Sequence, residues 1–187
     1  MINTLRALLM ALLLVVAGAT TAAATHGQPD RATPISGDIS GIDTPPDFTA
    51  PGCPEGASWR FESTGTGTLG HLGTVAFELA DCTTLDPADF SLSIAGTLWL
   101  TAANGDVLVI SLTGTGTFNP LLPPPPTVPW DITAWQVDQG TGRFADAAGS
   151  GHGHALTHIA QSAAETDFTE ISITGTISYD ASDRSHT

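Results

Sequence analysis

Apolar and polar residues alternate along most of the chain after residue 58, which is the pattern of half-buried β-strands. Apolar residues of one parity run from Phe90 to Leu100, and a second such run follows over 107–118. Asn104 and Gly105 lie between these runs, and this dipeptide favours a type I′ hairpin turn with a two-residue tip. The pattern therefore predicts strands near 90–101 and 107–118 joined by a tight turn.

Further alternating segments occupy 130–137, 150–159 and 171–179, and no helix of three turns can be placed between them. Seven or eight strands in sequence predict an all-β fold, a single antiparallel barrel of about eight strands. A two-sheet β-sandwich is the alternative. Trp99 departs from the inward parity of its strand, so it is predicted to lie on the outer face as a candidate anchor for a protein partner.

The ends of the chain lack this alternation. Arg6, an apolar run and small residues before Thr25 have the pattern of a signal peptide over 1–24, which predicts a secreted, extracellular protein. The apolar run is shorter than a membrane span, so no membrane insertion is expected after cleavage. Residues 25–57, rich in Pro and Gly, are predicted to be an extended arm, 58–180 the barrel domain and 181–187 a polar tail. The proline-rich segment 120–129 is predicted to be an exposed polyproline II connection.

Charge and cysteine content narrow the function classes. The chain has 5 basic residues, all Arg, against 19 acidic ones, for a net charge of -14. Nucleic-acid binding is therefore not expected, because it depends on Lys and Arg at phosphates. Cys53 and Cys82 are the two cysteines, and in an exported chain they are predicted to form a disulfide.

Three glycine-rich pieces occur in order at 65–73, 101–106 and 140–151. Together they resemble secreted bacterial domains of the allene oxide cyclase and dirigent-like barrel class, and the third resembles its Gly-Thr-Gly-x-Phe-x-x-Ala-x-Gly signature. The resemblance implies an eight-stranded barrel with a cavity that often holds an apolar small molecule. No position matches the catalytic residues of the plant enzymes, so it assigns no active site. Phe144, in the third piece, is expected to plug one barrel end.

Aromatic residues are the expected interior of such a barrel, either as a packed filling or as the wall of a ligand pocket. Glu62 and Glu78 have the opposite parity and are expected on the solvent side. The predicted pocket lining is Trp59, Phe61, Phe77, Trp130, Trp135, Phe144 and Tyr179.

His152 and His154 share the parity of one strand face, where two imidazoles could bind a single Zn, Cu or Ni ion. The competing interpretation, which we expect to hold, is a row of solvent-exposed histidines. No cofactor is predicted.

These observations favour a secreted β-barrel that binds an apolar small molecule or acts as an extracellular accessory protein. The alternatives are an isomerase or cyclase that works in the barrel lumen, and an extracellular protein-interaction module. The sequence favours a non-enzymatic function without deciding the question, and it leaves the oligomeric state open.

Overall fold

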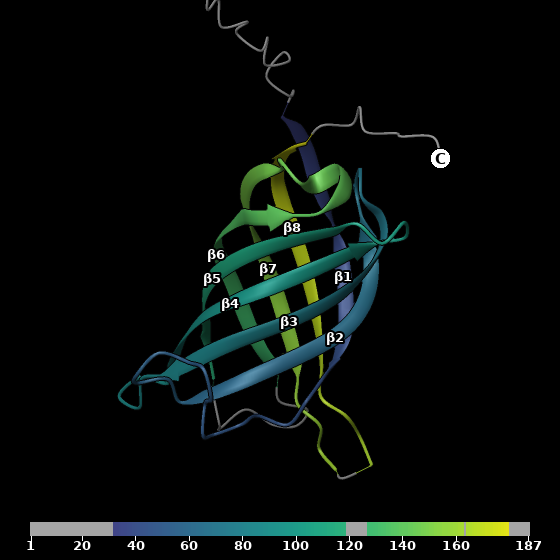
Figure 1. The fold of residues 1–187 in the computed structure, drawn as a ribbon. Helices are drawn as coiled ribbons and strands as arrows, with labels where there is room; N and C mark the ends of the chain where they lie inside the picture. Colours follow the sequence, from purple (N-terminus) through teal and green to yellow (C-terminus); the bar gives the residue numbers. More distant parts are fainter. Residues whose placement is uncertain (1–31, 119–126, 163, 180–187) are drawn as a thin grey trace, which may run out of the picture.

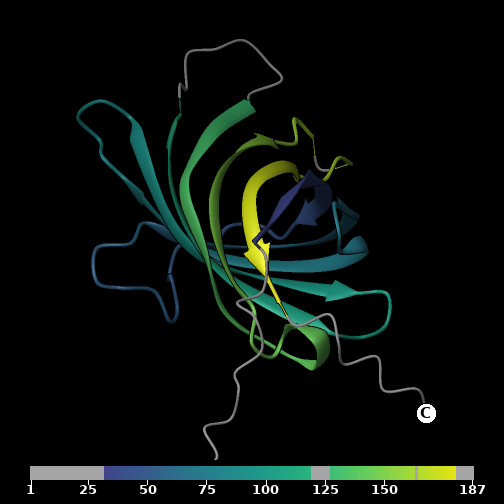
Figure 2. The same ribbon diagram turned by 90° about the horizontal axis from the view of Figure 1, so that it is seen from above.

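The chain folds into one closed barrel of eight antiparallel strands in a computed structural model that describes residues 32–118, 127–162 and 164–179. Each strand pairs with the next along the chain, and β1 pairs with β8 to close the circle (Figures 1 and 2). The predicted all-β barrel is confirmed, and closure excludes the sandwich. The elements are β1 (Thr33–Asp43), β2 (Trp59–Leu69), β3 (Gly73–Leu85), β4 (Ser91–Ala102), β5 (Val107–Thr117), β6 (Thr127–Gly140), the short 3-10 helix η1 (Gly142–Phe144), β7 (Ala148–His158) and β8 (Phe168–Ser178).

The predicted arm over 25–57 is wrong in its central part, because Thr33–Asp43 is barrel strand β1. This strand pairs with β2 on one side and β8 on the other, so the barrel begins at residue 33 instead of 58. The alternation was hard to see because only Ile35 and Ile39 are apolar among its buried inward residues. The predicted signal peptide and polar tail lie outside the described residues.

Glycine pairs on neighbouring strands make room for large rings inside the barrel. Gly151 and Gly175 are register partners, and a Cβ added to either would come within 2.6 Å of the Trp135 indole. The indole N–H of Trp135 donates to the carbonyl oxygens of His152 and Thr174, both at 3.2 Å. Trp135 therefore packs directly on the backbones of β7 and β8.

The same arrangement recurs on the adjoining part of the wall, formed by β1 and β2. Gly41 of β1 and Gly65 of β2 are register partners, and a Cβ on either would lie within 2.7 Å of the Phe77 ring. Interiors are close-packed, so a ring of this size needs neighbours without side chains. The glycine-rich pieces of the sequence thus supply space for aromatic packing.

One end of the barrel is closed by η1, as the sequence predicts for Phe144. The Phe144 side chain is fully buried and meets the Tyr179 ring edge-on, with ring centroids 5.2 Å apart. The Arg143 guanidinium covers the Phe144 ring at 4.6 Å. These contacts seal this end with aromatic and cation–π packing.

The turn between β4 and β5 differs from the predicted two-residue tip. The Gly105 N–H donates to the Ala102 carbonyl, and the Ala102 N–H donates to the Asp106 carbonyl, so three residues form the tip. Gly105 has a φ of 88°, whereas Asn104 does not have a positive φ. This is the pattern of a type I turn followed by a left-handed glycine, and the type I′ prediction is wrong because only one residue adopts the left-handed conformation.

The predicted polyproline segment over 120–129 is wrong at its C-terminal end. Thr127 already belongs to β6, and Pro129 pairs with Leu156 of β7. Pro129 lies beyond Trp130, the last β6 residue paired with β5, so its missing N–H is tolerated at this edge. Residues 119–126 lie outside the described residues.

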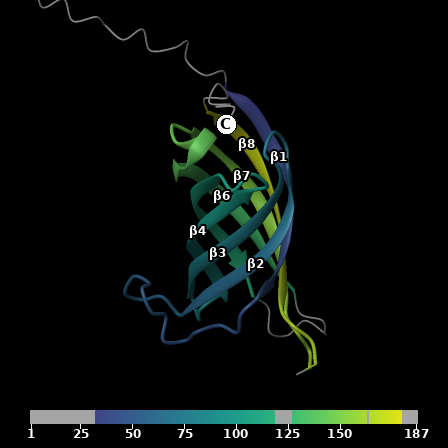
Figure 3. The same ribbon diagram turned by 45° about the vertical axis from the view of Figure 1, so that its right-hand side comes forward.

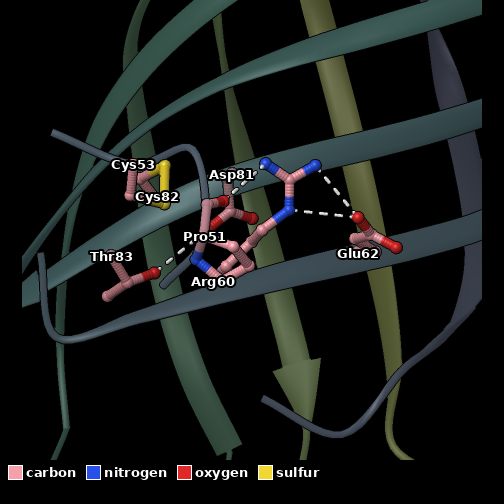
Figure 4. The surroundings of a disulfide bond; sticks show 7 residues. All are labelled: Pro51, Cys53, Arg60, Glu62, Asp81, Cys82 and Thr83. Atoms are coloured by element: carbon pink, nitrogen blue, oxygen red, sulfur yellow. Dashed lines mark hydrogen bonds and ion pairs between the residues drawn. A yellow bond between two sulfur atoms is a disulfide. The ribbon is translucent and has the colours of Figure 1, made fainter. Parts of the chain in front are cut away.

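The predicted disulfide between Cys53 and Cys82 is confirmed, with Cα atoms 5.6 Å apart. It ties the loop over 44–58, which projects from the end of the barrel opposite η1, to strand β3 (Figures 3 and 4). The two cysteines are 29 residues apart in the sequence, and closing a loop of that length stabilises the fold by about 3 kcal/mol. On the outer face, Arg60 reinforces the loop, because its guanidinium donates to Glu62 at 2.9 Å and to the Pro51 carbonyl at 3.4 Å.

Candidate functional site

The barrel is hollow at the end opposite η1. A cavity of about 350 Å³ lies inside it and reaches the loops there, since Pro46, Phe48 and Ile159 contribute to its wall. Aliphatic and aromatic side chains from the strands form nearly all of the remaining wall. The wall includes the apolar residues Trp59 and Phe61 of β2, Leu79 of β3, Trp130 of β6 and Ala155 of β7, and the polar residues Asp81 of β3, Thr157 of β7 and Thr169 of β8.

The predicted pocket residues divide between this cavity and the packed core. Trp59, Phe61 and Trp130 line the cavity. The other four lie elsewhere in the barrel, because parity gives the direction of a side chain but not its height along the barrel axis. Phe77, Trp135 and Phe144 are buried in the packed core, and Tyr179 packs against it.

A chain of hydrogen bonds crosses the inner wall of the cavity. The Trp130 indole N–H donates to the Thr157 hydroxyl at 3.0 Å, and the hydroxyls of Thr157 and Thr169 are 2.9 Å apart. Thr169 donates to Asp43 at 2.7 Å, and Ser63 donates to the other Asp43 oxygen. Because Thr169 uses its single hydroxyl proton on Asp43, Thr157 is the donor in its hydrogen bond with Thr169, and both carboxyl oxygens of Asp43 are acceptors.

Two opposing influences act on the pKa of Asp43. Burial raises it above the usual value, while the hydrogen bonds from Ser63 and Thr169 lower it. Burial is the larger influence, so the net change is upward. The two hydroxyl donors nevertheless satisfy the carboxylate form.

Asp81 is the second carboxyl in the lumen, and it has fewer partners. Its side chain is buried beside Gly96 of β4, where an added Cβ would lie 2.7 Å from the Asp81 Cβ. Within the described residues, the Thr83 hydroxyl, at 3.0 Å, is its only hydrogen-bond partner (Figure 4). Burial, reinforced by the nearby charge of Asp43, raises the pKa of Asp81 to about 7. Near neutral pH this group can therefore either donate or accept a proton.

Neither interior carboxyl was predicted from the sequence, although the pattern of β3 indicates the position of Asp81. Asp81 shares the parity of Val75, Phe77 and Leu79, which are all inward apolar residues of β3. Extending that parity by one step would have placed Asp81 in the lumen. Asp43 had no such signal, because its strand was not recognised.

His152 and His154 are exposed on the outer face of β7, as the solvent-exposed interpretation expected. His154 approaches Asp131, with Nδ1 3.6 Å from the carboxylate oxygen. Among the described residues, no group of three or more His, Cys, Asp or Glu side chains is placed to hold a metal. Binding of an ion by this pair of histidines stays a prediction.

The outer wall agrees with the parity argument. Glu62 and Glu78 are exposed, and Trp99 lies half-buried on the outside between its register partners Glu78 and Val109. A role of Trp99 in binding a partner stays a prediction.

Comparisons of the chain with protein-family models, with curated proteins and with solved structures found no match. In the part of the chain that the structure describes, no helix has the length and apolar character that crossing a membrane requires.

Proposed function

We propose that the protein is an extracellular binding protein that holds an apolar small molecule in the open end of its barrel. The observation that carries this proposal is the cavity, which is apolar, reaches the loops at one end and lies opposite the end closed by η1. Its volume falls in the usual range for small-molecule sites. The resemblance to the allene oxide cyclase and dirigent-like class supports the same function.

Exposed apolar residues at the mouth of the cavity add to this argument. Phe48 is 73% exposed and contacts the Trp59 ring edge-on, with centroids 6.2 Å apart. Pro46, in the same loop, is partly exposed and also lines the cavity. Apolar groups at the entrance favour the approach of an apolar ligand. The Cys53–Cys82 disulfide is consistent with the extracellular compartment that the proposed signal peptide implies.

Binding of the neutral apolar dye N-phenyl-1-naphthylamine to the chain over 25–187 tests the proposal. We expect the dye fluorescence to rise on binding, with a micromolar dissociation constant. Ala155 lines the cavity, so Ala155→Phe should weaken binding at least tenfold, whereas Ala134→Phe on the exposed face of β6 should not.

Circular dichroism of both variants checks that the barrel is intact. Absence of dye binding to the wild type, or equal binding to both folded variants, would overturn the proposal. Native mass spectrometry of the exported protein would then show whether a natural ligand co-purifies.

Asp81 supports a second candidate function, a lumenal isomerase or cyclase that uses this carboxyl for proton transfer. Its pKa of about 7 suits a general acid or base at neutral pH. Ring opening of 5-nitrobenzisoxazole tests that chemistry, because a base removes the carbon-bound ring proton while the N–O bond breaks. A rate that disappears in Asp81→Asn but persists in Glu78→Gln supports the enzyme hypothesis. An equal rate in both variants contradicts it.

A further inference from the structure

The charges that face the cavity all have one sign. Its wall includes the carboxyls of Asp81 and Asp167, and within the described residues it includes no Arg, Lys or His side chain. Arg60 is the cation next to this region, but its guanidinium lies on the outer face, bound to Glu62 and the Pro51 carbonyl (Figure 4). A ligand in the lumen therefore meets carboxyl groups and, in the described wall, no cationic side chain, while the charge of Arg60 acts on Asp81 from the outer face and is outweighed by burial.

The carboxyls in and beside the cavity wall differ in burial and in the hydrogen bonds that they accept. Both oxygens of Asp43 already accept hydroxyl protons from Ser63 and Thr169. Asp167 accepts the backbone N–H of Ala160 at 2.6 Å. Asp81 accepts a single hydrogen bond, from Thr83, although a carboxylate can accept about four. Asp167 likewise accepts a single hydrogen bond but is partly exposed, so water can supply further donors to it, whereas Asp81 is buried. Asp81 is thus the buried carboxyl of the cavity wall with unused capacity to accept hydrogen bonds.

We propose that the cavity selects an apolar amine, with the ammonium group bound to Asp81 and the hydrocarbon or aromatic body against the apolar wall. This inference rests on the proposed small-molecule binding function and names its ligand class. An ammonium group offers three N–H donors and no acceptor, which matches a carboxylate that lacks donors. The rings of Trp59, Phe61 and Trp130 line the same cavity and can attract a cation through their faces.

The same groups discriminate against other amphipathic molecules. A fatty acid would bring a further buried negative charge into a cavity with no cationic side chain in its described wall, which is unfavourable in a low-dielectric site. A neutral alcohol can donate one hydrogen bond to Asp81 but gains no charge pairing. The expected order of affinity is amine, then alcohol, then carboxylate.

Displacement of N-phenyl-1-naphthylamine by octylamine, octanol and octanoate at pH 7.5 tests this order, because the three share one chain length. We expect octylamine to bind at least about tenfold more tightly than octanol, as charge-assisted hydrogen bonds are the stronger kind. Octanoate should bind most weakly. In Asp81→Asn the octylamine affinity should fall to that of octanol. Glu78→Gln removes one carboxylate from the opposite face of the same strand and should leave the order unchanged.

The outcomes separate the two proposals. Binding of the dye to Asp81→Asn shows that the variant retains a folded cavity. If the wild type binds the dye but prefers octanol or octanoate to octylamine, the amine inference is overturned and small-molecule binding stands. The inference also falls if Asp81→Asn retains the preference for octylamine. If the wild type does not bind the dye, both proposals fail.

Discussion

Asp81 occupies an inward position where this fold otherwise places apolar side chains, and its ionisation is linked to stability. Its pKa is about 7 in the folded protein, against 3.8 for a free aspartate. Between these values the folded state holds a proton that the unfolded state has lost, so the contribution of Asp81 to stability falls as the pH rises. Below about pH 4 both states are protonated and this penalty is absent.

Replacing this carboxyl should therefore change how stability depends on pH. Asp81→Asn cannot ionise, so its stability relative to the wild type should increase from pH 4.5 to pH 8 by a few kcal/mol, on the order of 4 kcal/mol at most. Urea unfolding of both proteins at these two pH values measures the difference. Other carboxyls cancel in the comparison, and Glu78→Gln provides the exposed control. A difference between the proteins that is independent of pH would contradict the assigned burial.

For single residues, the sequence predicted well which face of the barrel wall a side chain lies on. It did not predict whether an inward side chain lies in the packed core or at the cavity. It placed Glu62, Glu78 and Trp99 on the outer face and Phe144 at a closed end, as the structure has them. It could not show that Phe77 and Trp135 lie in the packed core while Trp130 lines a cavity, because that depends on position along the barrel axis.

Among the strands, prediction from the alternation of apolar and polar residues succeeds where the inward positions are continuously apolar. β4 and β5 have continuous apolar residues on one parity, and the sequence predicted them close to their observed bounds. β1 was not predicted as a strand because two of its inward positions are glycines, Gly37 and Gly41. The inward position at Gly41 is left to the Phe77 ring, which comes from another strand. Such a strand can be recognised only once its distant partner is known.

The assignment of β1 to the barrel predicts the result of a truncation. A chain that begins at residue 44 keeps Cys53 for the disulfide but lacks β1, which leaves β2 and β8 without their shared partner. We expect this chain to aggregate or to lose its fixed tertiary packing, because both strands then present unpaired edges. A chain that begins at residue 25 should fold. Gel filtration and near-ultraviolet circular dichroism distinguish the outcomes, and a monomeric, native-like shorter chain would show that β1 is dispensable.

Across the whole molecule, like charges dominate the electrostatics. The net charge is -14, and the ion pairs of the described residues involve two Arg, Arg60 and Arg143, and two His, His154 and His158. Repulsion among the remaining carboxylates opposes the compact state, and salt screens it.

Raising NaCl from 20 to 500 mM at pH 7.5 should therefore stabilise the protein. We expect a gain of about 1 kcal/mol, which corresponds to a rise in Tm of roughly 2–4 °C for a chain of this size. Thermal melts at the two salt concentrations measure it. A lower Tm in high salt would mean that the few attractive pairs outweigh the general repulsion.

Because β1 pairs with β8, every strand of the barrel has a neighbour on both sides, and the strand order is circular. Thr33 and Ile177 are register partners, so the first and last strands bring the two ends of the described barrel to the same place. A short peptide joining these ends could carry the chain from β8 directly into β1. New termini could then be opened at the exposed turn around Asn104 and Gly105 with every strand still next to its present neighbours. The position of the chain termini is thus independent of the strand pairing that closes the barrel and forms the cavity.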